Sequence, residues 1–289
     1  MKVLVTGAAG FLGTKIMQTL KNDLELVGTD RQGKEGYQIM DITDRNEVIS
    51  VIGKEKPDAV IHCAAMTDVD ASETEKEKAR KINVEGASNV VDACEQYGST
   101  IVYISTDFIF EGDRGGYKEE DEPNPLSYYA KTKLEAENIV RQRSSDYLII
   151  RPEVLYGYNG NRSERSFTIW VYDNLKKGNH INVVDDQYNT PTLIDDIAEA
   201  ISKLLKKDSK GIYHVAGPER LSRYEMAVKL AEVFGFDKNL IKPITSDKLK
   251  QKAKRPKDSS LDTEKLKKEG INMHTFEQGL RIMKGQMSK

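Results

Sequence analysis

The chain begins with a short apolar segment that runs directly into a glycine-rich turn. Residues 3–5 are apolar, and the stretch TGAAGFLG that follows holds three glycines. An apolar run without alternation is typical of a strand in a parallel sheet, because both faces of such a sheet are covered. A helical pattern starts near residue 12. A strand, a tight turn and a helix start direct backbone N–H groups and the positive helix end at one point, where an anion can bind.

The spacing of these glycines, Gly-x-x-Gly-x-x-Gly, predicts a dinucleotide site. Gly7 allows the turn, Gly10 allows a pyrophosphate to approach the backbone, and Gly13 lets the helix pack on the strand. A strand–helix turn that simply requires glycine is the alternative. Asp30 ends the second predicted strand, where a carboxylate can accept hydrogen bonds from an adenosine ribose, whereas Arg31 could pair with a 2′-phosphate. The predicted cofactor is therefore NAD(H) or NADP(H), with NAD(H) favoured.

A second acidic turn, Asp41-Ile42-Thr43-Asp44, follows the expected third strand. In folds of this kind such a turn can flank the adenine. The alternative is that Asp44 only caps the next helix.

Apolar strand patterns alternate with helical patterns over the first half of the chain. This order predicts an α/β fold with a doubly wound parallel sheet of the Rossmann type. We expect a dinucleotide-binding domain over 1–156 and a smaller C-terminal substrate-binding lobe over 157–289, with some of its segments returning to the main sheet. The expected strands are 2–6, 24–29, 59–64, 100–105 and 147–151; the expected helices lie near 12–21, 44–54, 75–97, 126–143, 167–177, 195–206, 222–234 and 246–251.

Charge and composition exclude several other classes of protein. With 44 basic and 46 acidic residues, the chain has no global field that would attract a nucleic acid. No signal-peptide pattern or membrane-length apolar segment is present, so we expect a cytoplasmic protein. No cluster with metal-ligand spacing is present either, and no metal site is predicted. The basic run 248–257 can be a solvated face or a phosphate-binding patch.

The stretch SYYAKTKLEAE contains a candidate acid–base pair. Tyr129 and Lys133 are four residues apart on a predicted helix and therefore share one face. An ammonium within ~4–6 Å of a phenol would lower the pKa of the phenol toward working pH. Such a tyrosine can protonate a carbonyl oxygen while a nicotinamide delivers hydride. Tyr128 has Thr132 at the same offset and lacks a paired cation.

Polar residues also follow the strand predicted at 100–105. Ser105, Thr106 and Asp107 lie at the carboxyl end of this strand, the edge where parallel sheets present ligand-binding groups. A hydroxyl there could hold a substrate carbonyl in line with Tyr129. The alternative is a polar turn in which Asp107 acts as a cap.

Together these motifs resemble the extended short-chain dehydrogenase/reductases and, within them, the dTDP-4-dehydrorhamnose reductases. The resemblance covers nearly the whole chain. The general motifs are TGAAGFLG, HCAAMTDVDASE, INVEGASNV around Asn83, STDFIFEG and YYAKTKLEAE; the more specific ones are VVDDQYNTPT, GIYHVAGPE and KRPKDSSLDTEKL.

The resemblance implies a role for each matching residue. Thr106, Tyr129 and Lys133 correspond to the catalytic trio. The dinucleotide positions are Gly7, Gly10, Phe11, Leu12, Asp30, Arg31, Asp41, Ile42, Ala64, Ala65, Tyr129 and Lys133; the substrate positions are Thr67, Val69, Thr106, Asp107, Tyr129 and Val154. Two residues depart from the pattern: Phe108 stands where tyrosine is usual, and Val154 where tryptophan is common.

The implied activity is NAD(P)H-dependent reduction of the 4-keto group of a nucleotide-linked 6-deoxyhexose. One alternative is a sugar-nucleotide epimerase of the same fold. Another is a non-catalytic regulatory subunit resembling that of methionine adenosyltransferase, which belongs to the same branch. The resemblance also implies a possible homodimer, because similar proteins pair through the helices expected near 75–97 and 126–143. The alternative is that each is an ordinary helix that covers the sheet.

Overall fold

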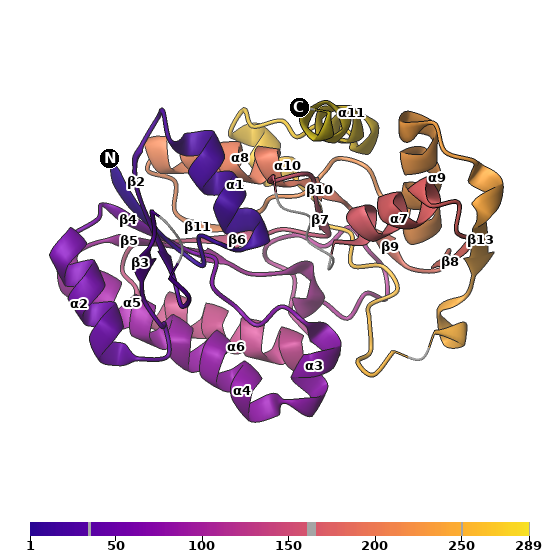
Figure 1. The fold of residues 1–289 in the computed structure, drawn as a ribbon. Coiled ribbons are helices and arrows are strands. Elements are labelled where there is room, and N and C mark those ends of the chain that lie inside the picture. Colours follow the sequence, from indigo (N-terminus) through magenta and orange to yellow (C-terminus); the bar gives the residue numbers. More distant parts are fainter. Residues whose placement is uncertain (34–35, 161–165, 250, 289) are drawn as a thin grey trace.

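A seven-stranded parallel sheet forms the centre of the molecule (Figure 1). The computed structural model describes residues 1–33, 36–160, 166–249 and 251–288. The strand order is β11-β6-β5-β4-β1-β2-β3. Its first six strands have the 3-2-1-4-5-6 order of a doubly wound sheet, which confirms the predicted fold class. The strands are β1 (Lys2–Thr6), β2 (Glu25–Asp30), β3 (Gln38–Ile39), β4 (Ala59–His62), β5 (Thr100–Ile104), β6 (Tyr147–Arg151) and β11 (Gly211–His214).

Helices cover both faces of this sheet (Figure 1). Alternate strand residues point to opposite faces, so Val3 and Val5 join one buried cluster and Leu4 joins the other. Helices α1 (Phe11–Leu20) and α8 (Ile194–Lys206) pack on the first face, and α2 (Arg45–Glu55), α5 (Gly86–Tyr97) and α6 (Tyr128–Arg143) pack on the second. The helices α5 and α6 contact each other along this second face, and their pairing with a second copy stays a prediction.

The segment expected as one helix over 75–97 is divided. Helix α4 (Lys76–Arg80) leads through a π-helical turn, Lys81–Glu85, into α5, and α3 (Val69–Thr74) precedes it. Asn83 lies in the π turn, where its amide exchanges hydrogen bonds of 2.8 and 3.1 Å with the backbone of Met66. The same amide donates to Thr132 of α6. The turn therefore ties the loop after β4 to α6, and π turns of this kind are frequent at functional sites.

The second half of the chain contributes to two cores. Strand β11 and helix α8 join the main sheet, while another apolar cluster gathers α7 (Phe167–Lys176), α9 (Arg223–Phe234) and α11 (Phe276–Met287). The smaller elements are β7 (Leu155–Tyr156) with β10 (Thr192–Leu193), β8 (Ile181–Val184) with β13 (Ile241–Ile244), β9 (Tyr188–Asn189) with β12 (Leu221–Ser222), and α10 (Glu264–Lys268). A domain boundary at residue 156 stays a prediction.

The prediction of a helix over 246–251 is wrong. The structure has a short 3₁₀ turn, Ser246–Lys248, followed by extended backbone at Leu249, and residue 250 lies outside the described residues. The backbone N–H of Ser246 donates to the carboxylate of Asp186 at 2.9 Å, and its hydroxyl donates at 2.8 Å. These bonds compete with a helical arrangement and hold the start of the segment beside the end of β8.

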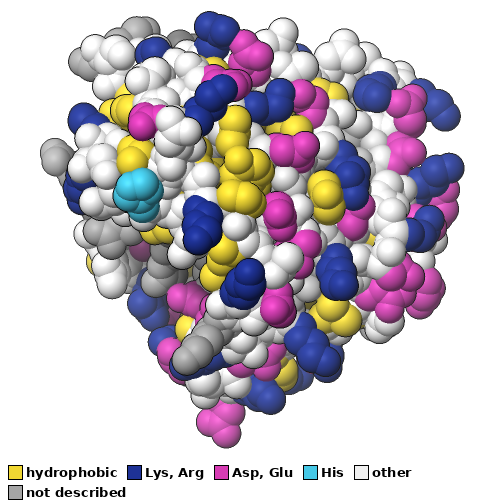
Figure 2. Space-filling model, turned by 90° about the vertical axis from the view of Figure 1, so that its right-hand side faces the viewer, with side chains coloured by type: hydrophobic (Ala, Val, Ile, Leu, Met, Phe, Trp, Pro, Cys, Tyr) yellow, Lys and Arg dark blue, Asp and Glu magenta, His cyan; other side chains and the backbone are white. Residues whose placement is uncertain are grey.

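Figure 2 shows the face that carries the C-terminal lobe. Apolar side chains gather in a band across its middle, and basic and acidic side chains alternate around the band without a field of one sign. Within the described residues, no helix combines the length and the apolar character that a membrane crossing requires.

Candidate functional site

The glycine turn after β1 has the geometry that the sequence predicted for it. Gly7 has φ +63°, and a Cβ there would lie 2.8 Å from the backbone N and Cα of Ala64. Gly10 occupies the N-cap of α1, and among the described residues no side chain caps this helix. The first N–H groups of α1 therefore face the loop edge of the sheet, as an anion site requires. Phe11 and Leu12 form the first turn of this helix.

Asp30 lies at the same edge of the sheet. Parallel pairing places Thr6 opposite Thr29, so the ends of β1 and β2 lie together and Asp30 neighbours Gly7. One carboxylate oxygen of Asp30 accepts from the backbone N–H of Gln32 at 3.1 Å, and the residue is partly exposed. Arg31 is exposed beside it.

For the acidic turn before α2, the prediction that Asp44 caps the helix is confirmed. Asp44 caps this helix and accepts from the backbone N–H groups of Asn46 and Glu47. Asp41 accepts from the backbone and hydroxyl of Thr43 at 2.8 Å, and Ile42 is buried in the core. Local turn bonds thus account for the acidic residues, and contact of this turn with an adenine stays a prediction.

Residues from the loop after β4 reach the same edge. Ala64 packs against the glycine turn, and Ala65 follows it. Thr67 is exposed, and Val69 begins α3 and is partly buried. This loop therefore connects the predicted cofactor positions with the predicted substrate positions.

Tyr129 and Lys133 are both buried in the first two turns of α6. Ser127 caps this helix, its hydroxyl accepting from the N–H of Ala130 at 3.2 Å. Tyr129 is 8% exposed and Lys133 is 3% exposed. The ammonium of Lys133 donates to the carbonyl oxygen of Ile104 at 2.6 Å and lies 4.2 Å from the centre of the Tyr103 ring. Lys133 is thereby held against the end of β5.

The electrostatics of this pair differ from the expectation. The pKa of Tyr129 is raised, first because the phenol is buried and second because the charge of Asp107 opposes its ionisation; a hydrogen bond with Thr106 acts in the opposite direction. Burial lowers the pKa of Lys133 to about 7, against the opposing influence of Glu137 and Cys63. The prediction that Lys133 lowers the pKa of Tyr129 is wrong, because the ammonium of Lys133 is directed to the backbone of β5. Tyr129 remains a protonated phenol at neutral pH.

Thr106 and Asp107 follow β5 after Ser105 and lie beside this phenol. The hydroxyl of Thr106 donates to Asp107 at 3.1 Å and accepts from the N–H of Phe108 at 3.3 Å. Burial raises the pKa of Asp107 to about 6, although hydrogen bonds from Ser259 and Thr106 favour its ionised form. The ring of Phe108 contacts Tyr129 edge-on, with 6.4 Å between centroids.

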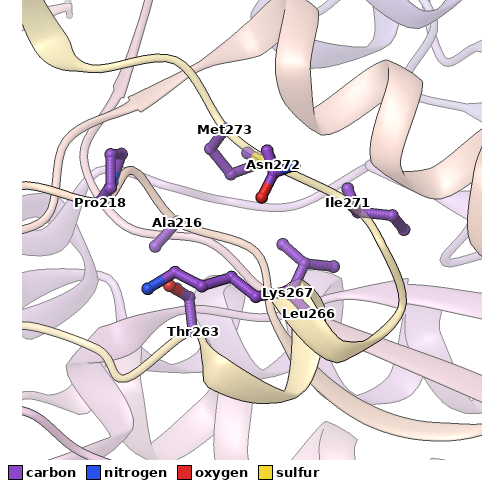
Figure 3. A pocket seen from close by; sticks show the side chains of 8 residues that line it. All are labelled: Ala216, Pro218, Thr263, Leu266, Lys267, Ile271, Asn272 and Met273. Atoms are coloured by element: carbon purple, nitrogen blue, oxygen red, sulfur yellow. The ribbon is translucent and has the colours of Figure 1, made fainter.

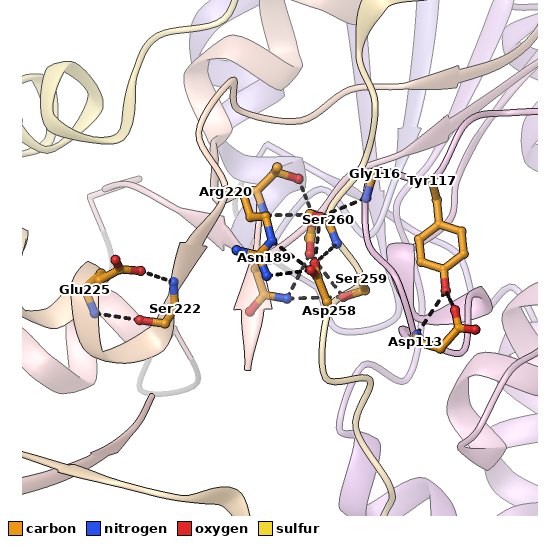
Figure 4. A network of polar contacts seen from close by, with 12 residues as sticks. Asp113, Gly116, Tyr117, Asn189, Arg220, Ser222, Glu225, Asp258, Ser259 and Ser260 are labelled. Atoms are coloured by element: carbon orange, nitrogen blue, oxygen red, sulfur yellow. Dashed lines mark hydrogen bonds and ion pairs between the residues drawn. The ribbon is translucent and has the colours of Figure 1, made fainter. Parts of the chain in front are cut away.

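The structure adds a buried carboxyl that sequence reasoning did not select. Glu153 is 0% exposed, and Asn189 donates to it at 2.8 Å, as does the backbone N–H of Thr190. The hydroxyl of Ser259 lies 3.1 Å from Glu153 and 2.6 Å from Asp107. Figure 4 shows Asn189 and Ser259 in contact, beside the separate pair of Asp258 and Ser260. An acidic residue within the apolar stretch RPEVLYG was the signal available in the sequence.

Arg223 at the start of α9 is the cation of this group. Its charge favours ionisation of Asp107, and the charges of Asp107 and Glu153 oppose the lowering of its own pKa by burial. The guanidinium also lies 5.1 Å from the centre of the Phe167 ring.

Val154, one of the predicted substrate residues, has an unusual backbone. Its φ is +39°, a conformation that costs a β-branched residue free energy. The carbonyl of Val154 accepts from the N–H of Thr192 at 3.1 Å, and the carbonyl of Glu153 accepts from the Thr192 hydroxyl at 2.7 Å. These bonds hold the strained residue, and strain of this kind is frequent at ligand sites.

A cleft of about 750 Å³ opens between the loop after β5 and the segment 245–257. Its lining includes Glu111, Leu126 and Asp186, together with most of the basic run. Arg255 from that run forms an ion pair with Asp70 of α3, with nitrogen–oxygen distances of 2.6 and 2.9 Å. The basic run therefore lines a cleft of the size that small ligands occupy, and its lysines Lys252, Lys254 and Lys257 are exposed to solvent there.

A second, smaller cavity of about 80 Å³ lies between the end of β11 and α10. Figure 3 shows its lining, with Ala216, Thr263 and Leu266 directed toward the same space. None of the predicted site residues contributes to it, so it is separate from the constellation at Tyr129.

A doubly wound parallel sheet, an uncapped glycine turn and a Tyr–Lys pair at the end of β5 define an oxidoreductase of the short-chain dehydrogenase/reductase type. The chain belongs to the family described as the RmlD substrate binding domain, whose model matches residues 1–288.

Three similar proteins illustrate the range of this family. A dTDP-4-dehydrorhamnose reductase from Bacillus anthracis, crystallised with NADP, superposes with a TM-score of 0.91, at 33% identity over 99% of both chains. A probable low-salt glycan biosynthesis reductase, Agl14, from Haloferax volcanii is 32% identical over 100% of this chain and 99% of that protein. The methionine adenosyltransferase 2 subunit beta of Bos taurus is 32% identical over 95% of this chain and 84% of the relative.

Proposed function

We propose that this protein is an NAD(P)H-dependent reductase that converts the 4-keto group of a nucleotide-linked 6-deoxyhexose to a hydroxyl. The proposed substrate is dTDP-4-dehydrorhamnose, and the product is dTDP-rhamnose. One observation carries the proposal: Thr106, Tyr129 and Lys133 meet at the end of β5, at the same sheet edge as the glycine turn. The solved reductase that is crystallised with NADP has the same fold along its whole length.

The glycine turn and Asp30 fit a dinucleotide. A Cβ at position 7 would collide with Ala64, and the uncapped start of α1 offers N–H groups to a pyrophosphate. The second oxygen of Asp30 suits a ribose hydroxyl, whereas the exposed guanidinium of Arg31 suits a 2′-phosphate. We therefore assign NAD(H) or NADP(H) as the cofactor, with NADH bound at least as well as NADPH. Phe11, Leu12, Asp41, Ile42, Ala64 and Ala65 complete the proposed cofactor positions.

The nicotinamide, when bound, supplies hydride to the keto carbon. Tyr129 donates the proton to the keto oxygen, and its raised pKa keeps the phenol protonated and ready to do so. Thr106 orients the reacting oxygen beside Tyr129. Lys133, fixed by the carbonyl of Ile104, is placed to bind the nicotinamide ribose. Tyr129 and Lys133 thus contact both the cofactor and the reacting end of the substrate.

The cleft along the basic run fits the nucleotide half of the substrate. Lys252, Lys254 and Lys257 line it, and their charges favour a diphosphate. The segment that follows β5 contributes Asp107 to the site at Tyr129 and Glu111 to this cleft, and we propose that one extended ligand occupies both. Thr67, Val69, Asp107 and Val154 are the proposed contacts of the sugar.

The test is a reductase assay with purified protein, dTDP-4-dehydrorhamnose and either NADH or NADPH. We expect one equivalent of cofactor to be oxidised for each sugar reduced, measured by loss of nicotinamide absorbance and by the mass of the product. An epimerase would interconvert sugars without net oxidation of cofactor. No turnover with any 4-keto nucleotide sugar would contradict the proposal.

The similarity to methionine adenosyltransferase 2 subunit beta supports a second candidate, a regulatory subunit that acts by binding a synthetase. The buried arrangement of Tyr129 and Lys133 favours catalysis, because a binding role alone does not require these groups to be desolvated. Co-purification with a synthetase, combined with silence in the reductase assay, would support the regulatory role.

A further inference from the structure

Glu153 is a fully buried carboxyl that the proposed reaction does not use. Its two oxygens lie within hydrogen-bond distance of groups from Asn189, Thr190 and Ser259. Its Oε2 accepts from both the backbone N–H and the hydroxyl of Thr190, as a carbonyl oxygen can. Its Oε1 lies 2.8 Å from the amide nitrogen of Asn189 and 3.1 Å from the hydroxyl of Ser259.

The hydroxyl of Ser259 decides which of these atoms carries a proton. A serine hydroxyl has one hydrogen to donate and two lone pairs to accept with. The 2.6 Å contact with Asp107 is shorter than the contacts of Ser259 with Glu153 and Asn189 and has the length of a hydroxyl bond to a carboxylate, so we assign the hydrogen of Ser259 to it. Asn189 donates to Ser259 at 3.2 Å and takes one lone pair. The remaining contact, with Glu153, is then a hydrogen bond only if Glu153 donates.

We propose, on the basis of the reductase function proposed above, that Glu153 works in its protonated form as a positioning residue. It donates to Ser259, so that Ser259 donates to Asp107 and fixes that carboxylate against Thr106 beside Tyr129. Glu153 touches no reacting atom and acts through this chain of hydrogen bonds. The arrangement leaves Asp107 as the charged member of the carboxyl pair.

The charges around the pair agree with this assignment. Among the described residues, Tyr129 from α6 and Arg223 from α9 interact with the pair through their charges. The charge of Arg223 favours ionisation of Asp107, the charge of Asp107 opposes ionisation of Tyr129, and Arg255 acts in turn on Arg223. Arg223 carries a single positive charge, which balances one carboxylate more readily than two. Burial and the charge of Asp107 raise the pKa of Glu153 well above its usual value, whereas the pKa of Asp107 rises to about 6. Both directions favour Glu153 over Asp107 as the carboxyl that keeps a proton.

The direct test is infrared spectroscopy of the purified protein at pH 7. A protonated carboxylic acid has a carbonyl band distinct from that of a carboxylate, and we expect such a band in the parent and its loss in Glu153→Gln. This measurement needs no substrate, so it tests the proposal even if the reductase activity is absent. A parent spectrum without the band at pH 7 would overturn the proposal.

The functional test uses the pH profile of kcat/KM. The amide nitrogen that Glu153→Gln introduces can donate to Ser259, and it cannot lose that proton. Asn189 donates to the same oxygen of Glu153 in the parent, so its amide must turn in the variant and present Oδ1 as the acceptor. We expect this variant to retain most of the activity of the parent at neutral pH. Of the loss of activity at higher pH, the step that belongs to Lys133, whose pKa is lowered to about 7, should remain in both proteins. The step that belongs to Glu153 should be absent from the variant. A variant that is inactive at every pH, or whose alkaline profile is the same as that of the parent, would contradict the proposal.

A serine pair supplies matched variants. Ser259→Ala removes the bridge between the carboxyls and should lower kcat/KM by about tenfold, the value of one hydrogen bond. Ser260→Ala removes a neighbouring buried hydroxyl that is bonded to Asp258 and lies outside this chain of bonds. It should leave kcat/KM unchanged. Equal effects of the two substitutions would refute a specific role for the bridge.

Discussion

Asp107 should make the protein less stable as the pH rises from 4 to 7. Its carboxyl is 3% exposed, and burial raises its pKa from 3.8 to about 6. Between these values the folded state holds a proton that the unfolded state has released. The free energy of unfolding therefore falls as pH rises through this window. A shift of this size corresponds to about 3 kcal/mol, a large part of the stability of a typical domain.

The substitution Asp107→Asn isolates this contribution. Asparagine matches the protonated carboxyl in shape, and the hydroxyls of Ser259 and Thr106 can rotate to pair with its amide. Near pH 4 we expect the variant and the parent to have similar free energies of unfolding. At pH 7 the variant should be more stable by up to about 3 kcal/mol, because it carries no buried charge. It should nevertheless lose activity, because Asp107 is a proposed contact of the sugar.

Urea denaturation at several pH values between 4 and 7 measures this difference. Asp70→Asn is the matched control with the opposite sign, because its ion pair with Arg255 lowers the pKa of Asp70 from 3.8 to about 2. Asp70 contributes stability above its unfolded pKa that is lost as pH falls through its folded pKa. The difference between this control and the parent should therefore change below pH 4 and stay constant from 4 to 7. A constant difference between Asp107→Asn and the parent over pH 4–7 would refute the reasoning.

Three further substitutions test other parts of the structure. Tyr129→Phe should lower turnover by roughly 10²–10⁴-fold if the phenol is the proton donor, with cofactor affinity preserved, whereas Tyr128→Phe should have little effect; equal turnover of both variants and the parent would exclude this mechanism. Asp30→Ala should shift the ratio of NADH to NADPH affinity toward NADPH, and an unchanged ratio in calorimetric titrations would show that Asp30 does not contact the ribose. Glu137→Gln leaves the guanidinium of Arg151 buried without its ion partner and should cost about 3–5 kcal/mol of unfolding free energy; a loss well below this range in urea denaturation would mean that the guanidinium finds another partner.

The parts of the fold that could be predicted are those that a short stretch of sequence specifies by its apolar residues or its glycine spacing. The strands of the parallel sheet are buried on both faces, so each reads as an apolar run, and the glycine turn is identified by its spacing. The helix Phe276–Met287 was missed although Thr275 and Gln278 form a capping box at its start. Two glycines lie inside this helix and weaken the pattern, and one of them, Gly279, is required by its close approach to Tyr156.

The chemistry of the site was predictable in its residue types but less so in its electrostatics. The four-residue spacing placed Tyr129 and Lys133 on one face of a helix. It could not show that the carbonyl of Ile104, which is 29 positions away in sequence, takes the ammonium. It also could not show that burial raises the pKa of Tyr129 further than any neighbour lowers it.

The carboxyl pair shows why some sites cannot be read from a sequence at all. Ser259 and Glu153 are 106 positions apart, and Ser259 and Asp107 are 152 apart. No periodic pattern connects such residues; they meet because β5 and β6 are neighbours in the sheet and the segment after β13 returns to the ends of both strands. The consequence reaches back to the local motif, because Asp107 contributes to the raised pKa of Tyr129 and its own position depends on Ser259. The acid–base character of a short and recognisable helix motif is therefore set by contacts that only the folded topology creates.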